Sequence, residues 1–168
     1  MVTRDNGLRR IYWIGRRTLG LADFEEAREL QPILVRSGAF GDGRPSRDMW
    51  VSPRHRFLLD RETDPVSGIA DREEVLISAR DLEDGRRIQW ARALGVSYIH
   101  ILCDRHQVIL ANGAWTESFH PDDETFAALA QSQQSELMQL FPDIETIGAS
   151  TRFRPARLII DQRSRFER

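Results

Sequence analysis

Residues 96–121 read VSYIHILCDRHQVILANGAWTESFHP. The run from Val96 to Cys103 is rich in β-branched and aromatic residues, which predicts a strand. The triplet Asp104-Arg105-His106 predicts a turn, and 107–110 predicts a second strand. This strand–turn–strand pattern indicates a mainly β protein, and the chain upstream of it follows the same pattern.

Short apolar segments separated by glycine, proline and aspartate predict further strands at 8–14, 32–36, 48–51, 57–59, 74–78 and 86–91, with turns at 5–7, 41–43, 64–65 and 83–85. Apolar residues at every third position predict a short helix over 21–30. After Pro121 the apolar spacing becomes helical and predicts one amphipathic helix, or two joined near Ser132, ending before Pro142. We therefore expect a β domain over 1–120 and a helical C-terminal extension over 121–168. The stretch from Thr151 fits a strand, a helix or a tail.

Composition excludes several functions. The 168 residues include 24 basic and 26 acidic side chains, and every basic one is arginine. Lysine chemistry, such as a Schiff base or a phosphate-binding lysine, is therefore excluded. The arginines alternate with acids and form no basic stripe, so no nucleic-acid partner is expected. Neither a signal peptide nor a membrane-spanning run is present, so we expect a soluble chain, either cytoplasmic or exported within a larger protein.

The chain has four histidines and one cysteine, and three of these five residues form the pattern His100-x-x-Cys103-x-x-His106. In a strand His100 shares its face with Tyr98 and Leu102, whereas Cys103 points the other way. This geometry is poor for a shared zinc ion, so no metal and no cofactor is expected. Cys103, in the run Ile101-Leu102-Cys103, is expected to be a small buried hydrophobe.

Residues 51–59, VSPRHRFLL, place a histidine at a polar corner between two short strands. The hydroxyl of Ser52, three residues before His55, is expected to bond across the turn and orient the imidazole, as a proton-transferring histidine requires. The alternative is that His55 only caps a hairpin.

Together these two segments resemble the bacterial branch of the Hint domain, the module shared by hedgehog autoprocessing domains and inteins. Ser52-x-x-His55 matches the T-x-x-H motif of that family with serine for threonine. The stretch from Tyr98 to Ala111-Asn112-Gly113 looks like its later motif, a strand that carries an acid or histidine and ends in A-x-G. Segments 15–23 and 38–48 are also similar. The resemblance implies a Hint-type β fold followed by a helical extension.

The resemblance also implies a mechanism. A Cys or Ser at the first residue of the family attacks the preceding carbonyl, which converts a peptide bond into a thioester or ester. The T-x-x-H histidine, here His55, protonates the departing nitrogen. The later acid or histidine, here His100, assists the nucleophile, with Asp104 and His106 as outer partners. A sterol, a downstream side chain or water then resolves the ester.

This sequence departs from the family at its beginning, because Met1 lies in a stretch that follows the nucleophile segment in family members. We therefore expect an N-terminally truncated domain that does not cleave itself, and whose substrate is its own upstream polypeptide in a longer form. A complete splicing reaction is not expected, because the terminal His-Asn pair is also missing. The alternative is a catalytically dead β-rich binding or structural module.

Overall fold

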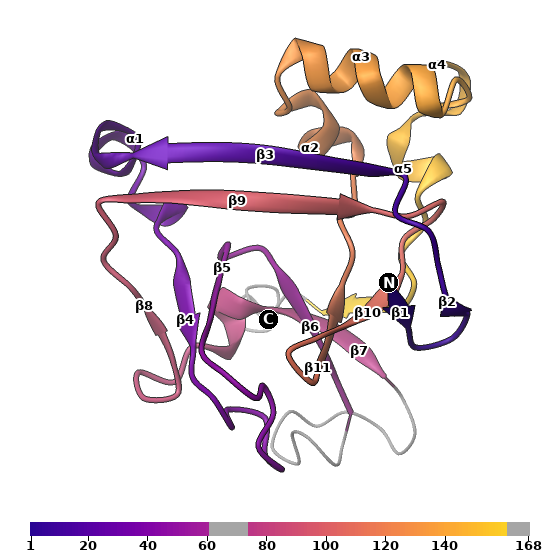
Figure 1. Cartoon of the computed structure of the whole chain (residues 1–168). Coiled ribbons are helices and arrows are strands. Elements are labelled where there is room, and N and C mark those ends of the chain that lie inside the picture. The colour runs from indigo at the N-terminus through magenta and orange to yellow at the C-terminus, as the bar shows by residue number, and fades with distance from the viewer. Residues whose placement is uncertain (61–73, 161–168) are drawn as a thin grey trace, which may run out of the picture.

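The computed structural model describes residues 1–60 and 74–160, and its strands form three groups (Figure 1). The largest is a seven-stranded sheet with the order β12-β7-β6-β11-β10-β1-β2. Its strands are β1 (Val2–Thr3), β2 (Gly7–Leu8), β6 (Arg56–Leu59), β7 (Val75–Ser78), β10 (Val108–Ala111), β11 (Ala114–Glu117) and β12 (Leu158–Ile160). The smaller three-stranded sheet comprises β5 (Met49–Val51), β4 (Ile33–Val35) and β8 (Ile88–Trp90).

The third group is a long antiparallel ribbon of β3 (Trp13–Gly20) and β9 (Gly95–Leu102). The two strands pair over their whole length, from Trp13 opposite Leu102 to Gly20 opposite Gly95. In Figure 1 the ribbon runs across one side of the molecule, with both sheets on its inner side. Most of its outward-facing positions are exposed, whereas Tyr98, His100 and Leu102 lie on the inner face; the sequence predicted that these three share a face.

The predicted fold class is confirmed, and the strands predicted at 32–36, 48–51, 57–59, 74–78, 86–91, 96–103 and 107–110 are all present within about two residues. The strand predicted at 8–14 is wrong, because the chain turns after β2 and β3 begins only at Trp13. The full extent of β3 was not predicted, because its middle residues, which include Arg16, are exposed and do not alternate between apolar and polar. β11 was also missed. The turn predicted at 64–65 lies outside the described residues.

Seven helical segments complete the described chain: α1 (Leu21–Glu26), η1 (Arg28–Leu30), η2 (Ala79–Leu82), α2 (Asp123–Ala127), α3 (Gln131–Leu140), α4 (Ile144–Ile147) and α5 (Ala149–Arg152). The helix predicted at 21–30 is interrupted at Ala27. After Pro121 the alternative of two helices is right, because α2 and α3 are separated at 128–130 and α3 ends before Pro142. Asp122 caps α2, and its carboxylate accepts a 2.7 Å hydrogen bond from the Thr125 amide.

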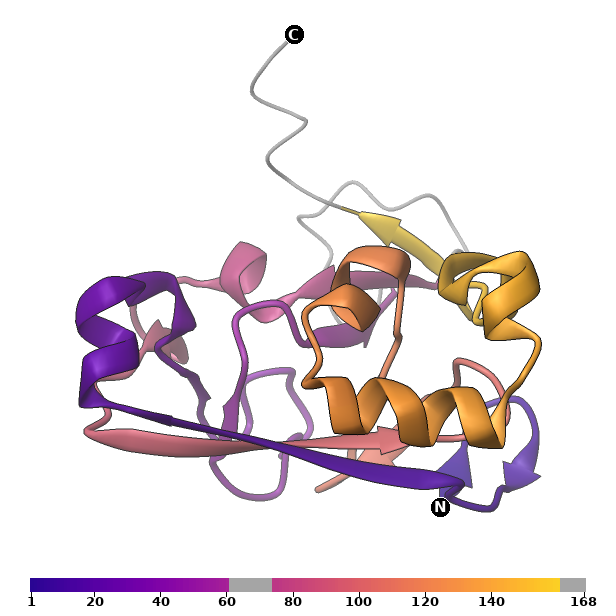
Figure 2. The same ribbon diagram turned by 90° about the horizontal axis from the view of Figure 1, so that it is seen from above.

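The C-terminal helices are packed onto one end of the ribbon (Figure 2). Their buried side chains form one cluster with the ribbon residues Trp13 and Leu102, and its helical and C-terminal members are Leu137, Phe141, Ile144, Ala149 and Phe153. The stretch after Thr151, left open by the sequence, leaves α5 and continues into β12, which pairs in parallel with β7. Residues 116–120 leave β11 and reach the ribbon, where the Phe119 amide donates to the Ile101 carbonyl at 2.7 Å.

Candidate functional site

His55 lies at the turn between β5 and β6, and backbone hydrogen bonds hold it on both sides. Its amide donates to the Ser52 carbonyl at 3.0 Å, which closes the turn, and its carbonyl accepts from the Ala79 amide at 2.8 Å. The half-buried imidazole meets the ring of Phe57 edge-on, with centroids 5.3 Å apart. These backbone hydrogen bonds therefore hold His55 in a defined position.

The hydroxyl of Thr116 on β11 orients the His55 ring. Thr116 is 1% exposed, and its Oγ1 is in hydrogen-bond contact with His55 Nε2. The same hydroxyl donates its hydrogen to the Arg56 carbonyl at 2.7 Å, so its oxygen must accept from the imidazole. Neutral His55 therefore carries its proton on Nε2 and has a free lone pair on Nδ1. The expected hydroxyl contact from Ser52 is wrong, because Ser52 meets His55 only through the backbone turn.

The surroundings of His55 lower the pKa of its imidazole. Burial is the main cause; the nearby carboxylate of Glu117 partly opposes it, and the charge of Arg56 adds to it. His55 is therefore neutral at pH 7, and its protonated form gives up its proton readily.

Glu117 is a buried carboxylate directly behind His55. It is 8% exposed, its Oε1 accepts from the Arg56 amide at 2.9 Å, and its Oε2 accepts from Arg56 Nη1 at 3.0 Å. His106 Nε2 lies 3.4 Å from the same Oε2. Burial alone would raise the pKa of Glu117, but the hydrogen bond from His106 and the charge of Arg56 outweigh it and hold the pKa below its usual value. Glu117 therefore stays ionised and clamps the peptide unit that joins His55 to Arg56.

His106 belongs to this Glu117 cluster. Its Nδ1 accepts from the Ala156 amide at 3.1 Å, which leaves the Nε2 proton facing Glu117. Its ring stacks on His120 with centroids 4.5 Å apart, and His120 Nε2 is 2.6 Å from the Phe153 carbonyl, to which it donates. Burial, and then the charge of His106, lower the pKa of His120.

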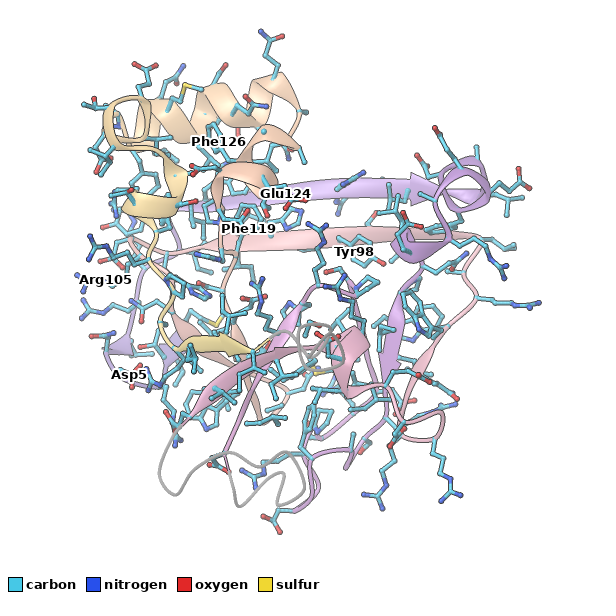
Figure 3. All side chains as sticks on the ribbon, turned by 180° about the vertical axis from the view of Figure 1, so that it is seen from behind. Asp5, Tyr98, Arg105, Phe119, Glu124 and Phe126 are labelled. Atoms are coloured by element: carbon cyan, nitrogen blue, oxygen red, sulfur yellow. The ribbon has the colours of Figure 1, made fainter. Side chains whose placement is uncertain are left out.

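His100 lies on β9 opposite Gly15 and is half-buried. Its ring packs on Phe119, with centroids 4.5 Å apart; Figure 3 labels Phe119 at the ribbon, on the side of the C-terminal helices. Burial, and then the charges of Arg17 and His55, lower the pKa of His100. The fold thus brings His55 close enough for its charge to affect His100, without a hydrogen bond between them.

The two residues expected as outer partners of His100 lie elsewhere. Asp104 is at the turn after β9, with its Oδ2 3.6 Å from Arg105 Nε, and His106 is part of the Glu117 cluster. The structure gives neither residue a contact with His100 in the part of the chain that it describes. A turn of three residues reverses the chain direction, so sequence proximity did not translate into contact.

Tyr98 lies two residues before His100 on β9 and shares its inward face; Figure 3 labels Tyr98 at this strand. Its hydroxyl donates to the Leu30 carbonyl at 2.9 Å. Burial raises the pKa of Tyr98, so the phenol stays protonated. Tyr98 therefore ties the ribbon to the segment before β4.

Cys103 is fully buried, as predicted from the aliphatic residues that precede it. Burial, and then the charge of Asp104, raise the pKa of its thiol, which disfavours the nucleophilic thiolate. Across residues 1–60 and 74–160, no group of three or more His, Cys, Asp or Glu side chains is arranged to hold a metal ion. No helix in these two ranges has the length and apolar character to cross a membrane.

Sequence reasoning missed Thr116, Glu117 and His120. The sequence AWTESFH (114–120) did contain a signal for these residues. Three polar residues in a row, Thr116 to Ser118, follow the turn at Asn112-Gly113, and an apolar strand precedes that turn. Buried polar side chains in a strand need partners, so such a run marks a network between strands. Which strands would supply the partners depended on the β11–β6 pairing, which joins segments about 60 residues apart.

The titration of His55 provides a direct check of this geometry. We expect His55 to titrate below the ordinary histidine value of about 6.5 and to carry its neutral-state proton on Nε2. Glu117→Gln should lower the pKa further, because the carboxylate charge favours the imidazolium, whereas exposed Glu26→Gln should not. Ring-nitrogen and Cε1 chemical shifts measured against pH report both quantities. A pKa above 6.5, or a proton on Nδ1, would contradict the arrangement.

A model of the Hint domain family matches residues 1–123. The match includes His55, His100, Asp104, His106 and the 116–120 segment. No curated protein and no solved structure matches the chain. The matched residues make up most of the chain and contain the mainly β architecture described above. This chain belongs to the Hint domain family.

Proposed function

We propose that this chain is a Hint-type autoprocessing domain in which His55 performs the proton transfers of an N-to-S or N-to-O acyl shift. The observation that carries the proposal is the Thr116 hydroxyl, which donates to the Arg56 carbonyl and therefore holds His55 with its Nδ1 lone pair free. A general acid or base needs such a fixed tautomer and orientation. The substrate is the upstream polypeptide of the same chain in a longer form.

The proposed reaction balances through one proton carrier. A cysteine or serine of an upstream segment attacks the carbonyl carbon before it, and a C–S or C–O bond forms as the C–N bond breaks. The nucleophile gives its proton to the free Nδ1 lone pair of neutral His55, and the imidazolium formed gives that proton to the departing nitrogen. Because burial lowers the pKa of His55, its imidazolium is a strong enough acid to protonate a poor leaving group.

His100 is the second proposed participant. It lies on the inner face of the ribbon within electrostatic range of His55, and burial keeps it neutral at pH 7. A neutral imidazole can accept a hydrogen bond from the nucleophile and so assist it while its proton passes to His55. Phe119 holds its ring in place. Ser52, Asp104 and His106 enter the proposal only as supports of the turns and of the Glu117 cluster.

The 168-residue polypeptide itself is expected not to cleave. Its cysteine is buried with a raised pKa, and the Thr3 hydroxyl donates to the Gly7 carbonyl at 2.7 Å. Intact mass, followed over days at neutral pH with and without added thiol, measures this. A time-dependent mass loss would show a nucleophile other than an upstream Cys or Ser. A catalytically dead binding or structural module is the alternative function, and an upstream stop codon in frame with Met1 would favour it.

A further inference from the structure

Arg17 on β3 lies on the inner face of the ribbon, beside His100. In the pairing of β3 with β9, Arg17 is opposite Tyr98 and Gly15 is opposite His100. Residues directly opposite each other in an antiparallel pair share a face, and diagonal neighbours, about 7–8 Å apart, remain within reach of a long side chain. The Arg17 side chain is therefore a diagonal neighbour of the His100 ring on the face that also looks toward His55.

The guanidinium of Arg17 is not neutralised by a carboxylate. Arg17 is exposed, and the structure gives it no ion pair within residues 1–60 and 74–160. Two carboxylates on the C-terminal helices have other partners: Glu136 on α3 accepts from Trp13 Nε1 at 2.7 Å, and Glu124 on α2 pairs with Arg54 at 3.0 Å. Because a guanidinium stays protonated in proteins, Arg17 keeps a full positive charge that can act on the groups beside it.

The positive charge of Arg17 acts on His100. Burial is the largest cause of the lowered pKa of His100, and the charges of Arg17 and then of His55 add to it. Arg16, the next residue along β3, points to the opposite face and is not among these causes. The charges that act on His55 do not include Arg17. Along this face the order is therefore Arg17, His100, His55, with the protonated phenol of Tyr98 opposite Arg17.

We propose that Arg17 activates the nucleophile of the acyl shift by stabilising the negative charge that the upstream cysteine or serine develops as it loses its proton. This inference rests on the proposed function, in which His100 assists that nucleophile and thus has it within range of the same arginine. A cation beside a thiol favours the thiolate, which is the attacking form. Arg17 exchanges no proton and forms no covalent bond: the proton passes to His55, and the electron pair of the nucleophile forms the bond to the carbonyl carbon.

The 168-residue chain itself tests where the charge of Arg17 acts. Arg17→Ala should raise the pKa of His100, because a positive neighbour disfavours the imidazolium, and Arg17→Lys should keep that pKa near the wild-type value. Arg16→Ala removes the same charge from the opposite face and should leave the pKa of His100 unchanged. Imidazole chemical shifts followed against pH measure all three. Equal changes in Arg17→Ala and Arg16→Ala, or no change in either, would overturn the proposal.

The pH profile of self-cleavage tests the activation. In a polypeptide extended upstream by a passenger and a segment with a cysteine nucleophile, Arg17→Ala should slow cleavage about tenfold near pH 7, which corresponds to a rise of about one unit in the thiol pKa. The difference should disappear above about pH 9, where a thiol ionises without help. Arg17→Lys should retain most of the rate because it keeps the charge, and Arg16→Ala should cleave as the wild type does.

The outcomes separate this inference from the proposed function. Equal rates in Arg17→Ala and the wild type at pH 7 would overturn the role of Arg17 and leave the acyl shift standing. A loss of rate that is the same at every pH would also overturn it, because Arg17 would then only support the fold of the ribbon. Absence of cleavage in the wild-type extended polypeptide at every pH would refute the proposed function, and the role of Arg17 with it.

Discussion

Replacing Glu117 with alanine is expected to lower the free energy of unfolding by about 3–5 kcal/mol. The change leaves the Arg56 amide and guanidinium and the Nε2 of His106 without their acceptor. Removal of one partner of a buried ion pair is costly, because the remaining charge stays in a site that water reaches poorly. Glu117 joins β11 to β6 at the point where the two strands pair, so the loss falls on the centre of the main sheet.

Urea unfolding measures this loss. Glu117→Gln keeps an acceptor for the Arg56 amide and should lose less than the alanine variant. Glu26→Ala, an exposed carboxylate near the end of α1, should change stability by no more than about 0.5 kcal/mol. A loss below about 1 kcal/mol in Glu117→Ala would mean that the cluster does not hold the two strands together.

Glu117 also makes the free energy of unfolding depend on pH. Because the pKa of Glu117 is lower in the folded chain than in the unfolded one, its ionised form stabilises the fold above the unfolded value of about 4.3. That contribution is lost as pH falls through the folded pKa, since protonation then removes the charge paired with Arg56. The Glu117→Gln variant should therefore lose less stability than the wild type between neutral and acidic pH.

The second large effect is expected at His55. In a polypeptide extended upstream by a passenger and a segment that bears the Cys or Ser nucleophile, His55→Ala should slow self-cleavage by about 10²–10⁴-fold. The variant removes the proposed proton donor to the leaving nitrogen. Gel separation of passenger and domain over time measures the rate, and urea unfolding of the variant shows whether the domain remains folded.

Thr116→Val tests whether orientation contributes to the same reaction. It removes the acceptor of the Nε2 proton while keeping a similar shape, so we expect slower cleavage together with a shift of the neutral tautomer toward Nδ1–H. Glu26→Gln in the extended polypeptide should cleave at the wild-type rate. Wild-type cleavage in folded His55→Ala would show that His55 is only part of the turn structure.

The segment 116–120 connects all four histidines. Thr116 meets His55, Glu117 meets His106, Phe119 packs on His100, and His120 stacks on His106. Strand alternation sends Thr116 and Ser118 to one side and Glu117 to the other, so one short stretch reaches several partners. A single substitution in this segment is therefore expected to affect both the proposed site and the main sheet.

The sequence predicted the β-rich fold class, most strands, the face that His100 shares with Tyr98 and Leu102, and the burial of Cys103. These features depend on local pattern: period-two apolar residues, turn residues, and the aliphatic residues that precede Cys103. The motif around His55 was found in the same way, because a histidine at a polar corner between two apolar segments is visible within nine residues.

What the amino-acid sequence determined by itself is thus the set of strands and the residue types available for proton transfer. The tertiary structure alone decided that Thr116, rather than Ser52, orients His55, and that His106 belongs with Glu117 rather than with His100. Both outcomes follow from the antiparallel pairing of β6 with β11, where Phe57 lies opposite Thr116. Local propensity carries no information about which distant strands pair, because that choice is set by burial of their shared faces across the whole chain.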